Sequence, residues 1–120
     1  MIPHIDSTQF GKVTVEGIEY LHDIVIGLNG KVKKRKKKLS KVVYGTSHIV
    51  SRDEAVHILD DGAKLLIVGT GQQGALSFSK EAMNYLASHG CRLILEPTPS
   101  AIQHWNRAGG AAIAMFHVTC

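Results

Sequence analysis

In the second part of the chain, residues 51–120, segments with the hydrophobic spacing of helices alternate with short apolar segments typical of strands. Ser51 and Glu54 form the pattern of a helix capping box, and apolar residues at helical spacing follow them. The run Leu65–Val68 is wholly apolar, which is typical of a strand covered on both faces. The predicted caps and stops of the helices are Ser51, Ser79, Thr98, Gly62, Gly90 and Gly109-Gly110. The predicted elements are helix 51–62, strand 65–68, helix 79–90, buried strand 92–95, helix 98–110 and strand 111–118.

Residues 1–50 instead show the pattern of short strands and tight turns. β-Branched and aromatic residues alternate with polar ones from Phe10 to Tyr20, and glycines interrupt the alternation. Asn29-Gly30 is a pair favoured in two-residue hairpin turns. Val42–Tyr44 predicts one more short strand. This part is therefore expected to be a β-rich layer of hairpins.

Strands that alternate with helices need crossover connections, and these produce a mainly parallel sheet. We therefore predict the α/β class, with a central mixed, mostly parallel sheet, flanking helices and an N-terminal antiparallel β-hairpin layer. A chain of 120 residues is long enough for one core but not for two. The prediction is a single domain over residues 1–120, in which 1–50 form the layer and 51–120 the alternating part.

Composition excludes several classes of protein. No apolar run approaches the roughly 20 residues of a membrane-spanning helix, and the N-terminus lacks the features of a signal peptide. We therefore expect a cytoplasmic protein without a membrane partner. The two cysteines, Cys91 and Cys120, are too few for a disulfide scaffold and match no zinc pattern. We predict no metal and no cofactor, and we expect Cys91 to be a buried apolar residue.

The net charge of +4 comes from one segment. Eight of the 14 lysines and arginines lie between Lys31 and Lys41 without an acid among them, and the rest of the chain has 6 basic and 10 acidic residues. The candidate anion-binding residues are Lys33, Lys34, Arg35, Lys36, Lys37 and Lys38. No aromatic residue is interleaved for base stacking, which disfavours nucleic acid without excluding it. A solvated arm that protects a strand edge from pairing is the alternative.

The motif Gly69–Gly74 has the form G-x-G-x-x-G and follows a predicted strand. Ligands of open α/β sheets sit outside the carboxyl ends of the strands, so we expect a cleft between 69–78 and 96–98. Its candidate ligand-binding residues are Gly69, Thr70, Gly71, Gln72, Gln73, Gly74, Glu96 and Thr98. Thr46 and His48 are secondary candidates, because a histidine titrates near neutral pH. A dinucleotide is disfavoured, because residues 75–78 separate the glycines from the next helix.

Four segments give the chain a resemblance to a known family. They are Gly45-Thr46-Ser47-His48, Leu66–Gly71, Trp105-Asn106 and Phe116–Cys120. In this order they resemble the archaeal MTH-type domain family of unknown function. That family includes a vertebrate adipogenesis-associated domain protein and a mitochondrial assembly factor of respiratory complex I. The resemblance implies one domain with a central mixed sheet, an additional N-terminal β layer and a last strand antiparallel to the others.

Three functional hypotheses remain open from the sequence. The leading one is a non-catalytic binding or assembly module whose cleft at the strand ends takes a protein partner or a small polar or anionic ligand. The second is a small-molecule enzyme that uses the Gly69–Gly74 turn and Glu96. The third is polyanion or nucleic-acid binding through Lys31–Lys41. A homo-oligomer is compatible with each of them.

Overall fold

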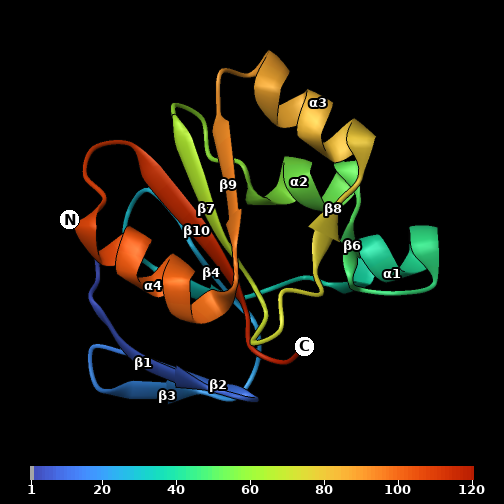
Figure 1. Cartoon of the computed structure of the whole chain (residues 1–120). Coiled ribbons are helices and arrows are strands. Elements are labelled where there is room, and N and C mark those ends of the chain that lie inside the picture. The colour runs from blue at the N-terminus through green and yellow to red at the C-terminus, as the bar shows by residue number, and fades with distance from the viewer. Residues whose placement is uncertain (1) are drawn as a thin grey trace.

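The computed structural model describes residues 2–120, which fold into a central sheet with a layer on each side (Figure 1). The helices are α1 (Lys38–Tyr44), α2 (Arg52–Ile58), α3 (Lys80–Ser88) and α4 (Thr98–Arg107). The strands are β1 (Ile5–Gln9), β2 (Lys12–Val15), β3 (Ile18–Tyr20), β4 (Ile24–Ile26), β5 (Val32–Lys34), β6 (Ile49–Val50), β7 (Leu65–Thr70), β8 (Ser77–Phe78), β9 (Arg92–Glu96) and β10 (Ala112–His117). Within these residues, no helix has the length and apolar character needed to cross a bilayer.

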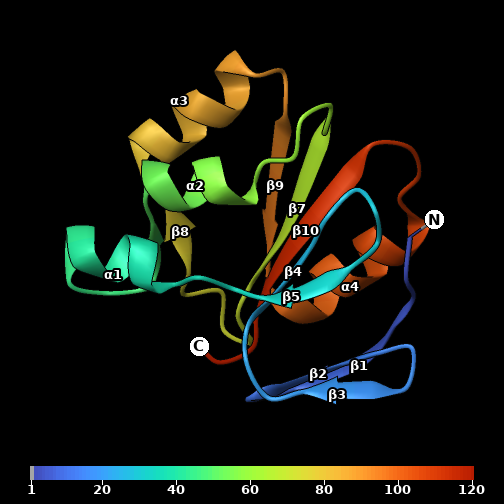
Figure 2. The ribbon, with the colours of Figure 1, turned by 180° about the vertical axis from the view of Figure 1, so that it is seen from behind.

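The central sheet has the strand order β5-β4-β10-β7-β9. Strands β7, β9 and β10 pair in parallel, whereas β4 is antiparallel to both of its neighbours. Four of the five strands therefore point the same way, and the carboxyl ends of β5, β7, β9 and β10 meet at one edge. Strands β1–β3 form a separate antiparallel sheet below α4 (Figures 1 and 2). The predicted α/β class, with a mixed sheet and an N-terminal β-hairpin layer, is confirmed.

Two predictions about the strands are wrong. The last strand, β10, is not antiparallel to the others, because the α4 crossover returns the chain to the same direction as β7. Strand β9 is not buried, because it is the outer strand of the sheet and Leu95 is 40% exposed. The predicted Asn29-Gly30 hairpin does form and joins β4 to β5.

Val42–Tyr44 also departs from the prediction, because it forms the end of α1 and not a strand. Gly45 ends this helix in the left-handed conformation, and its N–H donates to the carbonyl of Lys41. The buried Ser40 hydroxyl holds the helix to Glu54 and to the backbone of Ser51. The intrinsic β preference of two valines is worth only about 1 kcal/mol, which such tertiary contacts outweigh.

The predicted helix caps are partly correct. The hydroxyls of Ser51 and Ser79 accept from the backbone N–H three residues on, as helix caps do. Helix α2 ends at Ile58, before Gly62, which was the predicted stop. Thr98 is not a cap: it lies inside α4, and its side chain bonds elsewhere.

Side chains of the central sheet alternate between two cores. Ile67, Ala114 and Phe116 face α4 and the N-terminal layer, where Ala101, Ile102 and Trp105 are buried as predicted. The intervening side chains of β7 and β10 face α2 and α3. Strand β10 lies in the middle of the sheet and is buried along its whole length. Both faces of β7 are covered, as its apolar run predicted.

The Trp105-Asn106 pair fixes the N-terminal layer to the sheet. The indole N–H of Trp105 donates to the carbonyl of Pro3 at 2.9 Å. The Asn106 amide accepts from the N–H of Ile5 and donates to its carbonyl, at 2.9 and 2.8 Å. One segment of the predicted family resemblance therefore serves to attach β1 to α4.

Candidate functional site

The predicted cleft at the carboxyl ends of the strands is filled by the last residues of the chain. The N–H of Gln72 donates to the carbonyl of Thr119 at 2.7 Å. The N–H groups of Gln73 and Ala75 donate to the carbonyl of Cys120, at 3.2 and 3.0 Å. The backbone of the Gly69–Gly74 turn is therefore occupied by residues 119–120 and not open to a ligand.

The glycines of this turn have packing roles. A Cβ on Gly71 would lie 2.2 Å from the carbonyl carbon of Cys120, and one on Gly69 would lie 2.7 Å from Oγ1 of Thr98. Thr98 Oγ1 donates to the carbonyl of His117 at 2.6 Å and accepts from the N–H of Gly71 at 2.9 Å. Among the other predicted residues, Thr70 is buried, Gln72 reaches Thr8 Oγ1 in the N-terminal layer, and Gly74 has a positive φ.

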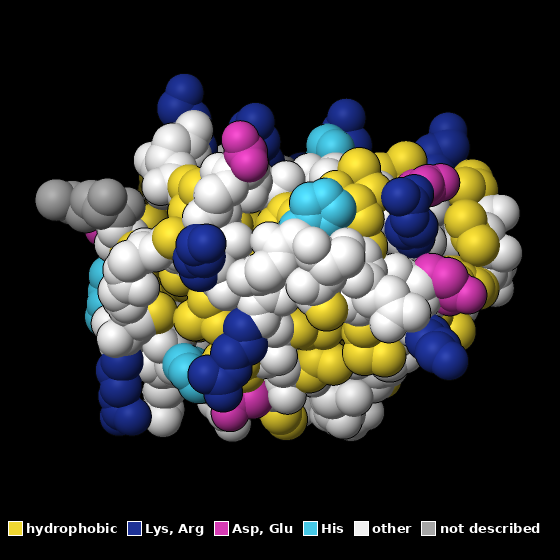
Figure 3. Space-filling view, turned by 90° about the horizontal axis from the view of Figure 1, so that it is seen from above, with side chains coloured by type: hydrophobic (Ala, Val, Ile, Leu, Met, Phe, Trp, Pro, Cys, Tyr) yellow, Lys and Arg dark blue, Asp and Glu magenta, His cyan; other side chains and the backbone are white. Residues whose placement is uncertain are grey.

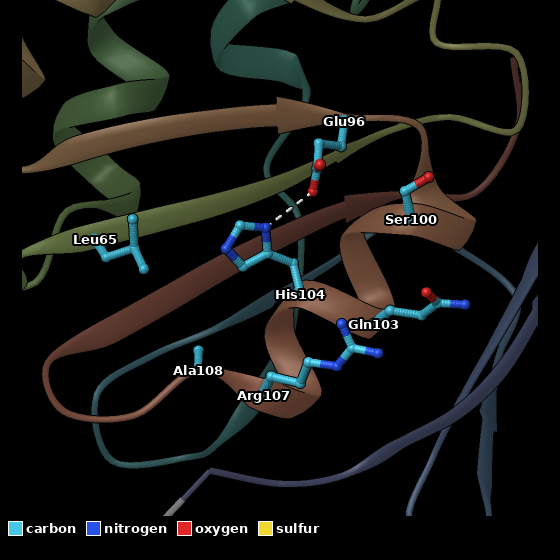
Figure 4. Close-up of a pocket in the computed structure, with 7 residues that line it drawn as sticks. All are labelled: Leu65, Glu96, Ser100, Gln103, His104, Arg107 and Ala108. Carbon is cyan, nitrogen blue, oxygen red and sulfur yellow. Dashed lines mark hydrogen bonds and ion pairs between the residues drawn. The ribbon is translucent and has the colours of Figure 1, made fainter.

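The backbone of Glu96 pairs with Gly69, but its side chain lines a shallow groove beside α4 (Figure 4). Its carboxylate points toward His104, whose Nδ1 lies 3.1 Å away. Ser100, Gln103 and Arg107 line the same groove, and each comes from α4. The Glu96 and His104 side chains are about as exposed as ordinary surface pairs, and such pairs contribute little. The structure therefore places the backbone of Glu96 beside Gly69 but directs its carboxylate to His104, and not to the Gly69–Gly74 turn with which the enzyme hypothesis combines it.

A second groove at the same edge of the sheet contains the other predicted histidine, His48. It has a volume of about 350 Å³ and lies where β5 and β10 end and β4 begins. We call it the His48–His117 groove. Its lining residues are Leu21, His22, Asp23, Lys34, Arg35, Lys37, Ser47, His48, His117, Val118 and Thr119.

A buried hydrogen-bonded pair, Asp23 and His117, forms the wall of this groove. Nδ1 of His117 donates to Oδ2 of Asp23 at 2.8 Å, which leaves Nε2 beside the Thr119 hydroxyl at 3.2 Å. The second Asp23 oxygen accepts from the N–H of Val118 at 2.9 Å. The ring of His48 meets the ring of His117 edge to face, with 5.3 Å between centroids.

Arg35 stands behind this wall and is the one residue of the basic run that is buried, at 3% exposure. Its Nε and Nη2 donate to the fully buried carboxylate of Glu54, and its Nη1 donates to Asp23 at 2.9 Å. Burial disfavours the charged guanidinium, but the hydrogen bonds and charges of Glu54 and Asp23 outweigh this and raise the pKa of Arg35. The guanidinium of Arg35 is thus paired with two carboxylates inside the protein. We therefore do not include Arg35 among the residues that we propose to bind an anion.

Burial alone would raise the pKa of Asp23. The hydrogen bonds from His117 and Val118, and the nearby Arg35, act in the opposite direction and lower the Asp23 pKa from 3.8 to about 2. A carboxylate with a depressed pKa in the folded state stabilises the fold above its unfolded pKa. We therefore expect this stabilisation to be complete above about pH 4 and lost as pH falls toward 2.

The Asp23 contribution can be measured by urea unfolding between pH 2 and pH 7. The pKa difference corresponds to about 2 kcal/mol. In Asp23→Asn, the decrease in the free energy of unfolding between pH 4 and pH 2 should be smaller than in the wild type by about that amount. Asp61→Asn is the control, because Asp61 is exposed and should leave the decrease unchanged. Equal pH profiles for Asp23→Asn and the wild type would contradict this assignment.

The cations that remain free in the groove are the two lysines of its rim. Lys34 and Lys37 line it, and neither forms an ion pair with a carboxylate within residues 2–120. The hydroxyl of Thr46, the other secondary candidate, accepts from the N–H of His48 at 3.1 Å and shapes the loop. Across the described part of the chain, no three His, Cys, Asp or Glu residues come close enough together to hold a metal ion.

Sequence reasoning did not find Asp23 and His117 as a pair. The two residues are 94 positions apart and meet only because β4 and β10 are neighbours in the sheet. The sequence did indicate His117 indirectly, because residues 116–120 contribute to the family resemblance and place His117 at the end of a predicted strand. In the structure, parts of three of the four resembling segments meet near this edge, since Ser47, His48, Gly71 and His117 lie in or next to the groove.

Comparisons with known proteins identify a matching family and similar solved structures. Residues 5–117 match the model of a family described as "Protein of unknown function (DUF498/DUF598)". The chain is similar to the conserved hypothetical protein PH1505 from Pyrococcus horikoshii OT3, with 34% identity, a TM-score of 0.88, and coverage of 97% of this chain and 98% of that one. It is also similar to the protein MT938, with 33% identity, a TM-score of 0.82, and coverage of 98% and 99%.

A more distant likeness concerns the fold alone. A Bordetella pertussis protein that is described as a Mth938-like domain is 17% identical with a TM-score of 0.65, over 97% of this chain and 85% of that one. No curated protein matches the sequence.

Proposed function

This chain belongs to the DUF498/DUF598 family of proteins of unknown function, and from that premise we propose that it is a non-catalytic module that binds a small anionic ligand. The family membership confirms the resemblance seen in the sequence. The ligand site that we propose is the His48–His117 groove. It lies at the carboxyl ends of strands β5 and β10, the edge where open α/β sheets bind their ligands.

The charge of the groove is the observation that carries the proposal. Among the described residues, Asp23 is the one acid that lines it, and this carboxylate already accepts from His117, Arg35 and Val118. Lys34 and Lys37 keep their positive charge free on the rim. An entering anion therefore meets two unpaired ammonium groups and no unpaired carboxylate.

The size and the donors of the groove support a small ligand. A volume of about 350 Å³ is at the lower end of the range for small-molecule sites. The ring of His48 adds an N–H donor, and charge-assisted hydrogen bonds to a carboxylate or phosphate are the strong ones. A compact molecule that carries one or two carboxylate or phosphate groups fits these features. The same chemistry on a larger molecule would place only its anionic group in the groove.

The proposal is tested by following the histidine side-chain resonances in NMR titrations with inorganic phosphate and with citrate. We expect saturable shifts for His48 and His117, because their rings border the proposed site. Lys34→Ala and His48→Ala should each weaken binding about tenfold, the usual effect of losing one hydrogen bond to a charged group.

Two matched variants control for charge and for the loss of a histidine. Lys64→Ala removes an exposed lysine, and His89→Ala removes an exposed histidine. Neither residue lines the groove. Both should bind as the wild type does. If neither anion gives a saturable shift, or if Lys64→Ala weakens binding as much as Lys34→Ala, the proposed site is wrong.

A further inference from the structure

Helix α1 projects from the body of the protein (Figures 1 and 2). It carries exposed aliphatic side chains. Val42 is 71% exposed and Val43 is 52% exposed, and Tyr44 next to them is also exposed. Ser40 is the one buried residue of the helix. Aliphatic side chains that are gathered and exposed in this way mark interaction sites more often than isolated ones do.

An apolar hollow continues this exposed surface toward the sheet. It has a volume of about 480 Å³, and Leu39 and Val42 line it together with residues 34–38. The stems of lysines close its sides, since long basic side chains cover apolar surface while their ammonium groups stay in water. We call the whole region the α1 surface, and its residues are Lys36, Lys37, Lys38, Leu39, Lys41, Val42, Val43 and Tyr44.

The lysines around this hollow have no acidic partner. Lys36, Lys37, Lys38 and Lys41 are exposed, and none of them pairs with a carboxylate within residues 2–120. Figure 3 views the protein from the edge of the sheet where strands β7 and β9 begin. On that face, lysines and arginines lie apart from one another among other side chains. The α1 surface thus combines an apolar centre with a rim of one charge, which is the anatomy of a protein interface.

We propose that the α1 surface docks an acidic amphipathic helix of a partner protein. The apolar face of such a helix would cover Leu39 and Val42, and its aspartates and glutamates would meet the lysines of the rim. Charge complementarity of this kind steers encounter and rejects basic partners. The α1 surface shares Lys37 with the rim of the adjacent His48–His117 groove, but the inference does not depend on a ligand in that groove.

Two other classes of partner fit these observations less well. Nucleic acid offers no aliphatic surface to cover Val42 and Val43, and Tyr44 is the one aromatic of the α1 surface on which a base could stack. A bilayer is flat, whereas consecutive helical residues such as Val42 and Val43 point about 100° apart and present a curved surface. Helices that lie on membranes are also commonly much longer than the seven residues of α1.

The test is a selection of random peptides of about 15 residues, long enough for four helical turns, on the immobilised full chain. We expect enrichment of sequences with apolar residues three and four positions apart and with acids on the flanks. Binding of a selected peptide should weaken about tenfold in Val42→Ser/Val43→Ser, which keeps the charge, and in Lys36→Ser/Lys38→Ser, which keeps the apolar residues. Ile18→Ser, at an exposed aliphatic residue of the N-terminal layer, is the control and should change nothing.

Several results would overturn the proposal. Enriched peptides without acids, or peptides that bind the double valine variant as well as the wild type, would exclude this partner chemistry. Tight binding of polyuridylate or of phosphatidylserine vesicles that depends on Val42 and Val43, without any selected peptide, would assign the surface to nucleic acid or to a membrane. Self-association in sedimentation velocity that the double valine variant abolishes would assign it to a second copy of the chain.

Discussion

Replacement of Gly71 by alanine is expected to lower the free energy of unfolding by about 3–5 kcal/mol. Gly71 has a φ of +106°, a conformation that costs an alanine about 1–3 kcal/mol. The new Cβ would also overlap the backbone of Cys120 and would come within 2.9 Å of the His117 ring. The last residues of the chain would have to leave the three backbone hydrogen bonds that hold them. Urea unfolding, followed by the fluorescence of the single tryptophan, Trp105, measures the change.

Gly90→Ala separates the two causes of this effect. Gly90 also has a positive φ, of +70°, but a Cβ there meets no atom within 4 Å. The control should therefore lose only the conformational part, about 1–2 kcal/mol. If Gly71→Ala costs no more than Gly90→Ala, the contact with Cys120 does not constrain the turn, and the predicted cleft opens more easily than the structure implies.

Replacement of Arg35 by methionine is expected to destabilise the fold by about 3–5 kcal/mol, because it leaves a buried carboxylate without its cation. Glu54 is fully buried and accepts two hydrogen bonds from Arg35. After the substitution, Ser40 remains as its side-chain partner. Methionine has a similar length and no charge, so the loss reports on the ion pair more than on packing. Thermal and urea unfolding both measure it.

The exposed pair of Lys12 and Glu19 is the matched control. Its contact of 3.0 Å equals the longer of the two Arg35–Glu54 contacts, but both side chains reach solvent. Lys12→Met should therefore cost no more than about 1 kcal/mol. In Arg35→Met/Glu54→Leu, the loss should be smaller than the sum of the two single losses, because the unpaired buried charge is gone. Additive losses would contradict the proposed coupling of these two residues.

Local signals predicted the part of the fold that depends on neighbouring residues. The apolar run of β7, the hairpin at Asn29-Gly30 and the caps at Ser51 and Ser79 each act within a few positions, and all were found in the structure. The prediction of a strand at Val42–Tyr44 was wrong because a contact between Ser40 and Glu54, which no local pattern contains, holds this segment as a helix. The prediction that β9 is buried was wrong because strand order in a sheet depends on the whole topology.

The sequence predicts the edge of the sheet at which the proposed groove lies, but not the residues that form the groove. The groove that we propose lies at the carboxyl edge of the sheet, the region that the rule for parallel strands predicts. Asp23 was missed because it precedes a three-residue strand and has no signal of its own. Arg35 was placed with the solvated lysines, since a run of basic residues gives no sign that one of them turns inward to meet Glu54.

The position of β10 has a consequence for how the protein is made. A ribosome releases the chain from the N-terminus, so β4 and β7 emerge before the strand that lies between them. Until β10 arrives, each presents an unpaired edge that another nascent chain can join. A translation product that stops before residue 112 contains every helix of the fold but no continuous sheet. Such fragments are the species from this gene that chaperones and proteases would have to clear.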